Sequence, residues 1–201
     1  MLDLSRASDI MGCNMVIPLD VTRYFQHLEP RFPSFANDVP FTEPTLAACR
    51  DTHTLIAVPS LSIVELRDAL FTGSRDLLLL ESWFLKGAAA VAYDKGQPGW
   101  HLVRRTPVPD SCGRTWYEQQ ALLLAEEEVP AVRVLVYAMI VHYFATGERL
   151  FQDVHVRCAD TLPPVGRALV GHFGSYGVTI HSDLDDYSNE CIGLASERKP
   201  E

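Results

Sequence analysis

The hydrophobic pattern of the chain changes near residue 150. Before this point, apolar residues recur every three or four positions in several segments, which is typical of helices that bury one face. After it, Val154, Val156 and Cys158 alternate with His155 and Arg157. Because successive side chains on a strand point to opposite faces, this period of two predicts strands. The two parts together predict an α+β protein.

Local start and stop signals place the expected helices in the first 149 residues. Capping residues or prolines at the start and glycines or prolines beyond the end predict helices over 5–11, 18–28, 42–50 and 60–70. The stretch Thr115-Trp-Tyr-Glu118 matches a capping box, and its helix is expected to continue to about residue 125. A further helix is expected from Pro130 to Ala145. It is apolar on most sides, which predicts a place in the core.

The expected strands gather in the last third of the chain. Earlier strands are predicted only over 54–58 and 100–105, and the region 77–91 fits either a helix or a strand. The apolar segments 168–173 and 178–182 are separated by Gly174-Ser-Tyr-Gly177, which predicts a hairpin. A final strand is expected over 192–196, followed by a solvated tail over 197–201. Successive strands with short turns predict an antiparallel sheet, covered on one face by the central helix.

We interpret the chain as one domain spanning residues 1–201. It would comprise a helical N-terminal part (1–75), a mixed segment (76–149) and a β-rich part (150–197). The fold class is therefore α+β, with N-terminal and central helices packed on an antiparallel sheet that is concentrated in residues 150–197. A chain of 201 residues can bury enough surface to fold without disulfides or metal.

Composition restricts the function more than the fold. The 17 basic and 26 acidic residues give a net charge of −9, which repels phosphate backbones and argues against nucleic-acid binding. The longest strongly apolar run, Val134–Val141, is far shorter than the ~20 residues that span a bilayer. The chain begins without the pattern of a signal peptide. Five widely spaced cysteines, without a C-x-x-C motif, indicate reduced thiols in a cytoplasmic protein.

Three histidines fall in the predicted sheet, and they suggest a metal or a general base. His155 and His181 alternate with apolar positions, so they are expected on the face away from the core, where they could meet. Together with Asp183 they could hold zinc. Neither H-E-x-x-H nor H-x-H occurs, however, so solvated strand positions are the simpler interpretation for these two and for His172. We assign no metal and no cofactor.

Two further chemistries have weaker support. The acidic run 183–190 has the composition of a calcium loop, but Ser188 and Leu194 stand where an EF-hand beginning at Asp183 needs glycine and glutamate. Cys112 precedes the helix predicted at 115, where a thiol would gain reactivity, but nothing identifies a base for it. We therefore assign no catalytic residue, and the sequence favours a protein that is not an enzyme.

The segment His181-Ser-Asp-Leu-Asp-Asp-Tyr-Ser-Asn-Glu190 is the candidate binding surface. It lies between two apolar strands, and its residue types combine adaptable hydrogen bonding with a rigid aromatic ring. A loop held by strands at both ends is well placed for recognition, although an ordinary polar turn has the same composition. Our candidate ligand-binding residues are Tyr176, Thr179, His181, Asp183, Asp185, Asp186, Tyr187, Ser188 and Asn189.

Two resemblances add to these expectations. The motifs that carry the first are Gly99-Trp-His-Leu-Val-Arg-Arg-Thr-Pro-Val, Thr115-Trp-Tyr-Glu-Gln-Gln-Ala-Leu-Leu, Thr146-Gly-Glu-Arg-Leu-Phe, Val156-Arg-Cys-Ala-Asp160, Ile192-Gly-Leu-Ala-Ser-Glu-Arg-Lys, Ser8-Asp-Ile-Met-Gly12 and Cys49-Arg-Asp-Thr-His53. They resemble an uncharacterised bacterial family of hypothetical proteins, which implies no activity. The resemblance covers less than half of the chain.

The second resemblance concerns the C-terminal part. A glycine-marked strand, a Ser/Asp/Asn/Tyr-rich segment and a closing Ile-Gly-Leu strand resemble the variable proteins of diversity-generating retroelements. That resemblance implies a C-type-lectin-like fold that displays residues after Gly177 to a ligand. The chain departs from the family pattern at Leu184, where a tryptophan is expected before Asp185.

Three functions therefore stay open. The first is a non-catalytic module that binds a ligand or a protein through residues 176–190. The second is an enzyme of unknown class, a metal- or cysteine-dependent hydrolase type, that uses His155, His181 and nearby acids or Cys112. The third is an oligomeric interaction protein that associates through its sheet. We favour the first because no nucleophile, base and orienting group can be assembled from the sequence.

Overall fold

The computed structural model describes residues 2–17, 25, 38–70, 77–163 and 166–201. The helix predicted over 18–28 lies outside these residues, except for Phe25. Within them, helices and strands are present in similar measure, which confirms the α+β class. The lectin-like fold implied by the second resemblance stays a prediction.

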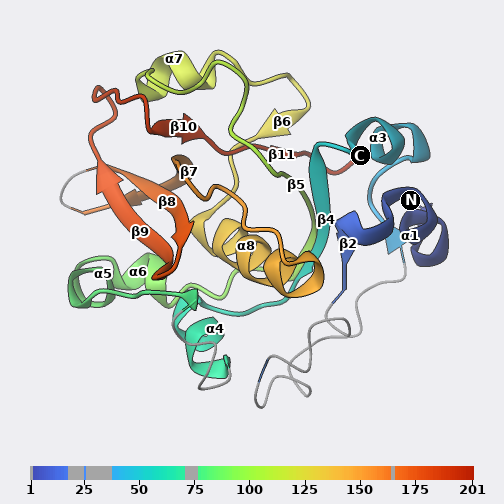
Figure 1. The fold of residues 1–201 in the computed structure, drawn as a ribbon, viewed down its shortest axis with the longest axis horizontal. Coiled ribbons are helices and arrows are strands. Elements are labelled where there is room, and N and C mark those ends of the chain that lie inside the picture. Colours follow the sequence, from blue (N-terminus) through green and yellow to red (C-terminus); the bar gives the residue numbers. More distant parts are fainter. Residues whose placement is uncertain (1, 18–24, 26–37, 71–76, 164–165) are drawn as a thin grey trace.

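The predicted C-terminal sheet is present as four strands in the order β10-β7-β8-β9 (Figure 1). These are β7 (His155–Leu162), β8 (Gly166–Gly174), β9 (Gly177–Asp183) and β10 (Ile192–Leu194). The predicted hairpin is confirmed as β8 and β9, which join through the turn between Gly174 and Gly177. The β7–β8 and β8–β9 pairs are antiparallel, whereas β10 runs parallel to β7 because the chain first crosses the outer face of the sheet.

A second sheet has five strands in the order β2-β4-β5-β11-β6. They are β2 (Met15–Val16), β4 (His53–Val58), β5 (Gly99–Arg104), β6 (Glu127–Glu128) and β11 (Glu197–Arg198). The strands at 54–58 and 100–105 were expected, but not their sheet, so strand pairing is not confined to residues 150–197. The prediction of a solvated tail over 197–201 is wrong, because β11 lies between β5 and β6.

The short helices include those predicted over 5–11, 42–50 and 60–70, with shifts of up to three residues at their ends, and the one predicted at Thr115, which ends at Gln120 instead of near residue 125. They are α1 (Leu4–Met11) with the 3-10 turn η1 (Gly12–Asn14), α3 (Glu43–Cys49), α4 (Ile63–Ala69), α5 (Ser82–Gly87), α6 (Ala89–Ala92) and α7 (Trp116–Gln120), while β1 (Leu2–Asp3) pairs with β3 (Asp38–Val39). The capping box at Thr115 is confirmed, and α4 has another in which Ser62, not the expected Ser60, is the N-cap. The ambiguous region 77–91 is mainly helical.

The helix α8 (Val132–Thr146) is the centre of the core, as its sequence predicted. Figure 1 shows it between the two sheets. One side of it packs on β4 and β5, and another packs on β7, β8 and β9. A helix covered on opposite sides must be apolar nearly all round, and each large side chain it buries contributes roughly 1.5–3 kcal/mol.

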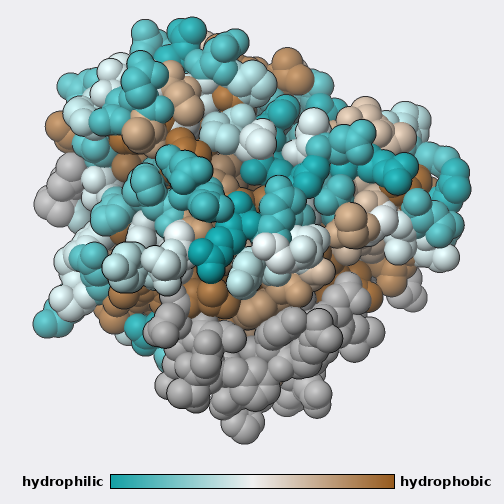
Figure 2. All heavy atoms as spheres, in the orientation of Figure 1, coloured by the Kyte–Doolittle hydropathy of each residue, from teal (hydrophilic) through white to brown (hydrophobic). Residues whose placement is uncertain are grey.

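Further layers cover the two outer sides. The helices α1 and α3 pack on the face of β4 and β5 that points away from α8, through a second cluster that includes Leu46, Leu55 and Leu102. Beyond the four-stranded sheet lies α7 with the loop that joins β9 to β10 (Figure 1). On the face seen in Figure 2, hydrophilic residues dominate the upper half, which includes the α7 region. Among the described residues, no helix is both long and apolar enough to cross a membrane.

Candidate binding site

The candidate site lies on the outer face of the four-stranded sheet. Val156, Val170 and Ile180 point inward to α8, so the residues next to them in each strand point outward. The register aligns His155 with Gly171 and Thr179, and it aligns Arg157 with Leu169 and His181. The sheet therefore brings His155 and His181 to one face, as the alternating pattern predicted.

The imidazole rings of His172 and His181 each contact that of His155 on this face. The ring centroid of His155 lies 4.4 Å from that of His172 and 5.1 Å from that of His181. His172 joins them because the β8–β9 register shifts between Gly171 and Gly174, and His172 adopts a positive φ of 46° there. No group of three or more histidine, cysteine or acidic residues in the described part of the chain is placed to hold a metal ion.

Hydrogen bonds and burial determine the protonation state and the orientation of the His155 ring. The Thr179 hydroxyl donates to the carbonyl oxygen of Gly171 at 3.0 Å, so it accepts from Nε2–H of His155, also at 3.0 Å. Burial lowers the pKa of His155 to about 4, with a further contribution from His172 and His181. His155 is therefore a neutral, oriented imidazole at neutral pH.

The loop beside this cluster spans residues 184–191. It is fixed in place by a fully buried arginine, Arg157. The Arg157 guanidinium donates to the carbonyl oxygens of Arg114 at 3.0 Å and Tyr187 at 2.5 Å, and to Oε1 of Gln119 at 2.8 Å. The amide nitrogen of Gln119 in turn donates to the carbonyl oxygens of Ser111 and Ile192. The middle of the loop and the residue that follows it are thus tied to α7 through a buried polar network.

Ion pairing and stacking hold the start of the same loop. Arg167 on β8 donates through Nε and Nη2 to the Asp185 carboxylate, at 3.3 and 3.0 Å. Its guanidinium lies 4.0 Å above the ring of Trp116, and the Trp116 amide donates to the carbonyl oxygen of Asp185. The amide of Gly113 donates to the carbonyl oxygen of Asn189 near the other end. The loop is therefore ordered before any ligand arrives.

A hollow of about 340 Å³ opens between the histidines and this loop. It is lined by His155, Leu169, His181, Ser182, Asp183, Tyr187, Asn189, Cys191 and Ile192. Leu169 and Ile192 give it apolar surface, and the polar groups surround them. Its volume is at the lower end of the range for small-molecule sites.

The nine residues predicted from the sequence have different positions relative to this hollow. His181, Asp183, Tyr187 and Asn189 line it, and Thr179 lies behind it through its hydrogen bond to His155. Asp185 is held by Arg167 instead, while Tyr176, Asp186 and Ser188 are exposed outside the lining. The sequence did not predict Leu169, Ser182, Cys191 or Ile192 as part of the site. It suggested His155 only as a residue of the enzyme alternative.

The thiol considered as a nucleophile has the wrong electrostatic environment. Burial raises the pKa of the Cys112 thiol, and the Glu190 carboxylate and Cys191 raise it further. A catalytic thiol needs a lowered pKa and an adjacent base. Cys112 therefore has none of the activation that the hydrolase alternative requires at neutral pH.

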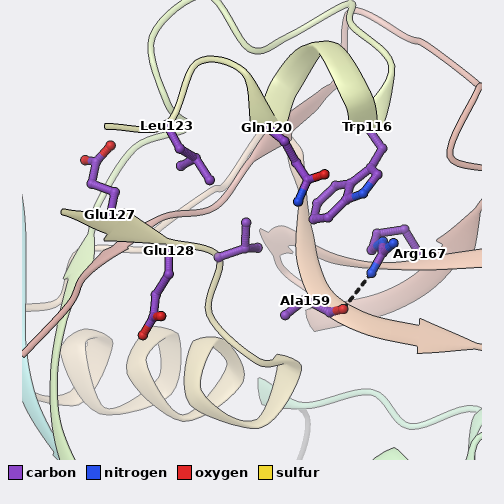
Figure 3. Close-up of a pocket in the computed structure, with 8 residues that line it drawn as sticks. Trp116, Gln120, Leu123, Glu127, Glu128, Ala159 and Arg167 are labelled. Carbon is purple, nitrogen blue, oxygen red and sulfur yellow. Dashed lines mark hydrogen bonds between the residues drawn. The ribbon is translucent and has the colours of Figure 1, made fainter. Parts of the chain in front are cut away.

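A second hollow, of about 590 Å³, lies between α7, β6 and the strands β7 and β8 (Figure 3). Its charged groups are largely occupied: Arg167 holds Asp185 and the carbonyl oxygen of Ala159, and Glu127 accepts from Arg104. Trp116 presents one ring face to Arg167.

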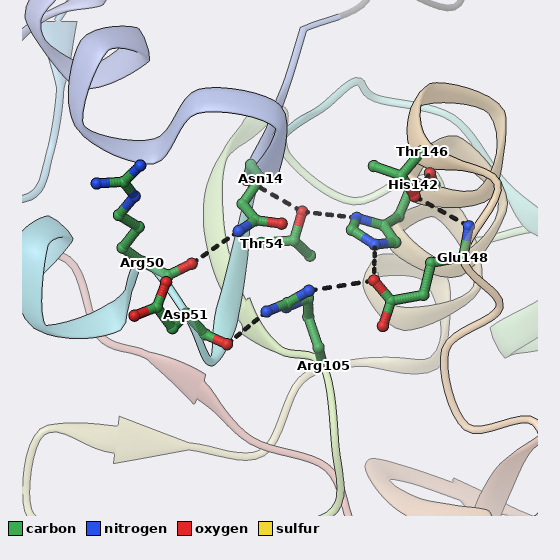
Figure 4. Close-up of polar contacts among 8 residues, drawn as sticks. All are labelled: Asn14, Arg50, Asp51, Thr54, Arg105, His142, Thr146 and Glu148. Carbon is green, nitrogen blue, oxygen red and sulfur yellow. Dashed lines mark hydrogen bonds and ion pairs between the residues drawn. The ribbon is translucent and has the colours of Figure 1, made fainter.

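Thr54, His142 and Glu148 resemble a catalytic triad in connectivity, but Thr54 and His142 are buried and only Glu148 is exposed (Figure 4). The two ring nitrogens of His142 lie 3.2 Å from Oγ1 of Thr54 and from a carboxylate oxygen of Glu148. Thr54 and His142 are both 0% exposed, so no substrate reaches them. We interpret this network, which Arg105 extends to the carbonyl of Asp51, as a polar connection between α8 and β4.

Comparisons with protein-family models, with curated proteins and with solved structures found no match to this chain.

Proposed function

We propose that the chain is a non-catalytic binding protein that recognises a segment of a partner protein through the histidine face and the 184–191 loop. The observation that carries the proposal is the hollow lined by His155, His181, Asp183, Tyr187 and Asn189 beside a loop that Arg157 holds in place. A binding surface ordered in advance loses less conformational entropy when it binds.

The side chains around the hollow suit a protein partner. Leu184 and Tyr187 expose 52% and 44% of their surface, and Tyr117 on the adjoining helix α7 exposes 67%. Exposed tyrosines supply rigid contact area together with a polar tip, and they are enriched at protein interfaces. Asp183, Asn189 and His181 add hydrogen-bonding groups that can fix the orientation of the partner.

The same geometry supports binding over catalysis. The Nε2–H of His155 is engaged by Thr179, and the Asn189 side chain bonds within its own loop, to the Tyr187 hydroxyl and the Cys191 amide. No thiol in the hollow is paired with a base in the described structure. The groups therefore form a recognition surface without the nucleophile and base of a hydrolase.

A selection from a displayed library of random peptides tests the proposal, with the reduced full-length chain as bait. We expect enriched peptides that bind Tyr187→Ala and His181→Ala about tenfold or more weakly than the wild type, as hot-spot residues do. Tyr93→Ala is the matched control, because Tyr93 is 56% exposed and lies outside the hollow. Calorimetry gives the affinities.

Two outcomes would overturn the proposal. One is the absence of any peptide enriched over a selection on an unrelated bait. The other is a set of peptides whose affinity falls equally with Tyr93→Ala and Tyr187→Ala.

A further inference from the structure

Two exposed cysteines flank the loop that borders the hollow. Cys112 precedes α7, and Cys191 ends the loop and lines the hollow itself. They are 79 positions apart in sequence (191 − 112), yet the segments that contain them lie against each other. Cys13 is the third exposed thiol, and it lies in η1 of the N-terminal layer.

The contacts around the two cysteines place their segments face to face. The Gly113 amide donates to the carbonyl oxygen of Asn189 at 3.0 Å, and the Leu194 amide donates to Oγ of Ser111 at 3.0 Å. The residues on each side of Cys112 therefore contact residues on each side of Cys191. A disulfide needs this kind of backbone approach, with Cα atoms roughly 4.4–6.8 Å apart.

The direction of the Cys112 side chain agrees with this placement. A Cβ atom built on Gly193 would lie 3.3 Å from Sγ of Cys112. The Cys191 thiol contributes to the raised pKa of the Cys112 thiol, so the two side chains lie near each other. On the other flank, a Cβ atom on Gly113 would lie 2.7 Å from the Glu190 carboxylate. Cys112 thus faces the stretch of chain between Glu190 and Gly193.

We propose that Cys112 and Cys191 are a redox-sensitive pair, which a peroxide links by a disulfide beside the binding hollow. In the first step the Cys191 thiolate attacks one peroxide oxygen, which breaks the O–O bond and yields a sulfenic acid and one water. The Cys112 thiolate then attacks the sulfenic sulfur and releases a second water. Two thiols lose two protons and two electrons, and hydrogen peroxide is reduced to two waters.

The order of the steps follows from the environment of Cys112. Cys191 opens on the hollow, whereas burial raises the pKa of the Cys112 thiol and slows its reaction with peroxide; we therefore assign the first step to Cys191 and the second to Cys112. For the same reason, the second step accelerates as the pH rises.

The disulfide would regulate the hollow, and this consequence rests on the proposed function. Cys191 lines the hollow, so a bond from its sulfur to Cys112 draws that part of the lining toward α7. The oxidised protein would then bind its partner with altered affinity, and a thiol reductant would restore the original state.

The test is peptide mapping of the full chain after treatment with hydrogen peroxide, without a reductant. Trypsin places Cys112 in the fragment 106–114 and Cys191 in the fragment 168–198, each with a single cysteine. We expect the linked pair of these fragments to be the main disulfide of the native protein. It should persist in Cys13→Ser and disappear in Cys191→Ser. In urea the pairing should spread over all five cysteines.

A second readout is independent of any ligand. The imidazole NMR signals of His155 and His181 should shift on oxidation, because both rings line the hollow with Cys191, whereas the signal of buried His142 should stay. A native disulfide pattern like that in urea, or separate sulfinic acids on Cys112 and Cys191, would refute the pair. If the linked fragments form but no peptide is selected, the pair stands and only the proposed function fails.

Discussion

Arg157 carries a buried charge without an ion-pair partner among the described residues. Burial lowers its pKa, yet a guanidinium stays charged at any physiological pH. The charge is met by two backbone carbonyls and Gln119, all of which belong to α7 and the loops beside it. These hydrogen bonds satisfy buried acceptors of both segments, so Arg157 fixes where the 184–191 loop sits.

We expect Arg157→Met to lower the free energy of unfolding by about 2–4 kcal/mol, because it leaves buried acceptors without donors. Amide hydrogen exchange in the 184–191 loop should accelerate together with this loss. The control is Arg67→Met, since within the described part of the chain the Arg67 side chain pairs with the exposed neighbour Asp68 and should change stability by about 0.5 kcal/mol or less. Urea unfolding and exchange mass spectrometry measure both effects. Equal losses in the two variants would contradict this interpretation of Arg157.

Two histidines make the stability depend on pH. Burial, with smaller effects of Arg104, Arg198 and Arg105, lowers the pKa of His53 to about 3, and the pKa of His155 is lowered to about 4. In the unfolded chain both histidines have a pKa of about 6.5. The folded state therefore binds fewer protons in this interval. Its stability is fully present above pH ~6.5 and is lost as the pH falls toward the folded-state values.

As the pH falls from ~6 to ~4, His53 and His155 should each lower the free energy of unfolding by up to about 1.4 kcal/mol per pH unit. In His53→Asn the loss of unfolding free energy per pH unit should be smaller by the contribution of one histidine, because asparagine does not titrate. Urea unfolding at a series of pH values gives both slopes. If the variant and the wild type lose stability with the same slope, His53 is not neutral in the folded protein.

The alternation of apolar and polar residues along the strands predicted only part of the candidate site. Alternation placed His155 and His181 on one face and predicted that they could meet. It could not place His172, which reaches that face through a bulge, or show that Arg167, 18 positions before Asp185, holds the carboxylate assigned to ligand binding. Those features depend on register and on contacts between elements.

At the scale of elements, local signals predicted where helices begin better than where they end. The capping box at Thr115 starts α7 as expected, but α7 ends at Gln120 rather than near residue 125. The following residues Ala121-Leu-Leu-Leu-Ala favour a helix, yet Glu127 pairs with Arg104 and its carboxylate also accepts from the Leu124 amide. The sheet thus overrides helix propensity.

The start of α8 shows a cap that the local sequence does not reveal. Its N-cap residue, Ala131, has no side chain that could accept, and the first turn has no acidic residue. Asp160 supplies the missing acceptor from β7, because its carboxylate accepts from the Val132 amide at 2.6 Å. A carboxylate at this end of a helix is also favoured by the helix dipole.

We expect Asp160→Ala to lower the free energy of unfolding by about 1–2 kcal/mol, the usual cost of a lost cap. Asp160→Asn keeps an acceptor and loses only the charge, so it should cost roughly half as much. Thermal and urea unfolding measure both. A larger loss in Asp160→Asn than in Asp160→Ala would show that the carboxylate acts elsewhere than at α8.

At the scale of the whole molecule, the five-stranded sheet is the feature that the sequence pattern did not predict. Its strands come from both ends and the middle of the chain, and three of them are only two residues long. Pairing between such distant short segments leaves no periodic signal. Charged residues at 197–199 gave the impression of a tail, although Glu197 contacts His101 at 2.6 Å and Arg198 contacts Glu126 at 2.9 Å.

Deletion of residues 197–201 tests whether this sheet holds the two ends of the chain together. Without β11, the strands β5 and β6 lose their common neighbour, and Leu102 and Val103 lose their partners in the sheet. We expect a loss on the order of 4–5 kcal/mol or more, enough to broaden or abolish cooperative unfolding. Deletion of 200–201 is the control, since it keeps β11 and removes the contacts of Glu201 with Thr42, Thr45 and the backbone of Pro40. Circular dichroism during urea unfolding compares the two. If the longer deletion unfolded like the control, β11 would be dispensable. If only the longer deletion unfolds early, the C-terminal residues complete the sheet on which α8, and through it the binding face, is packed.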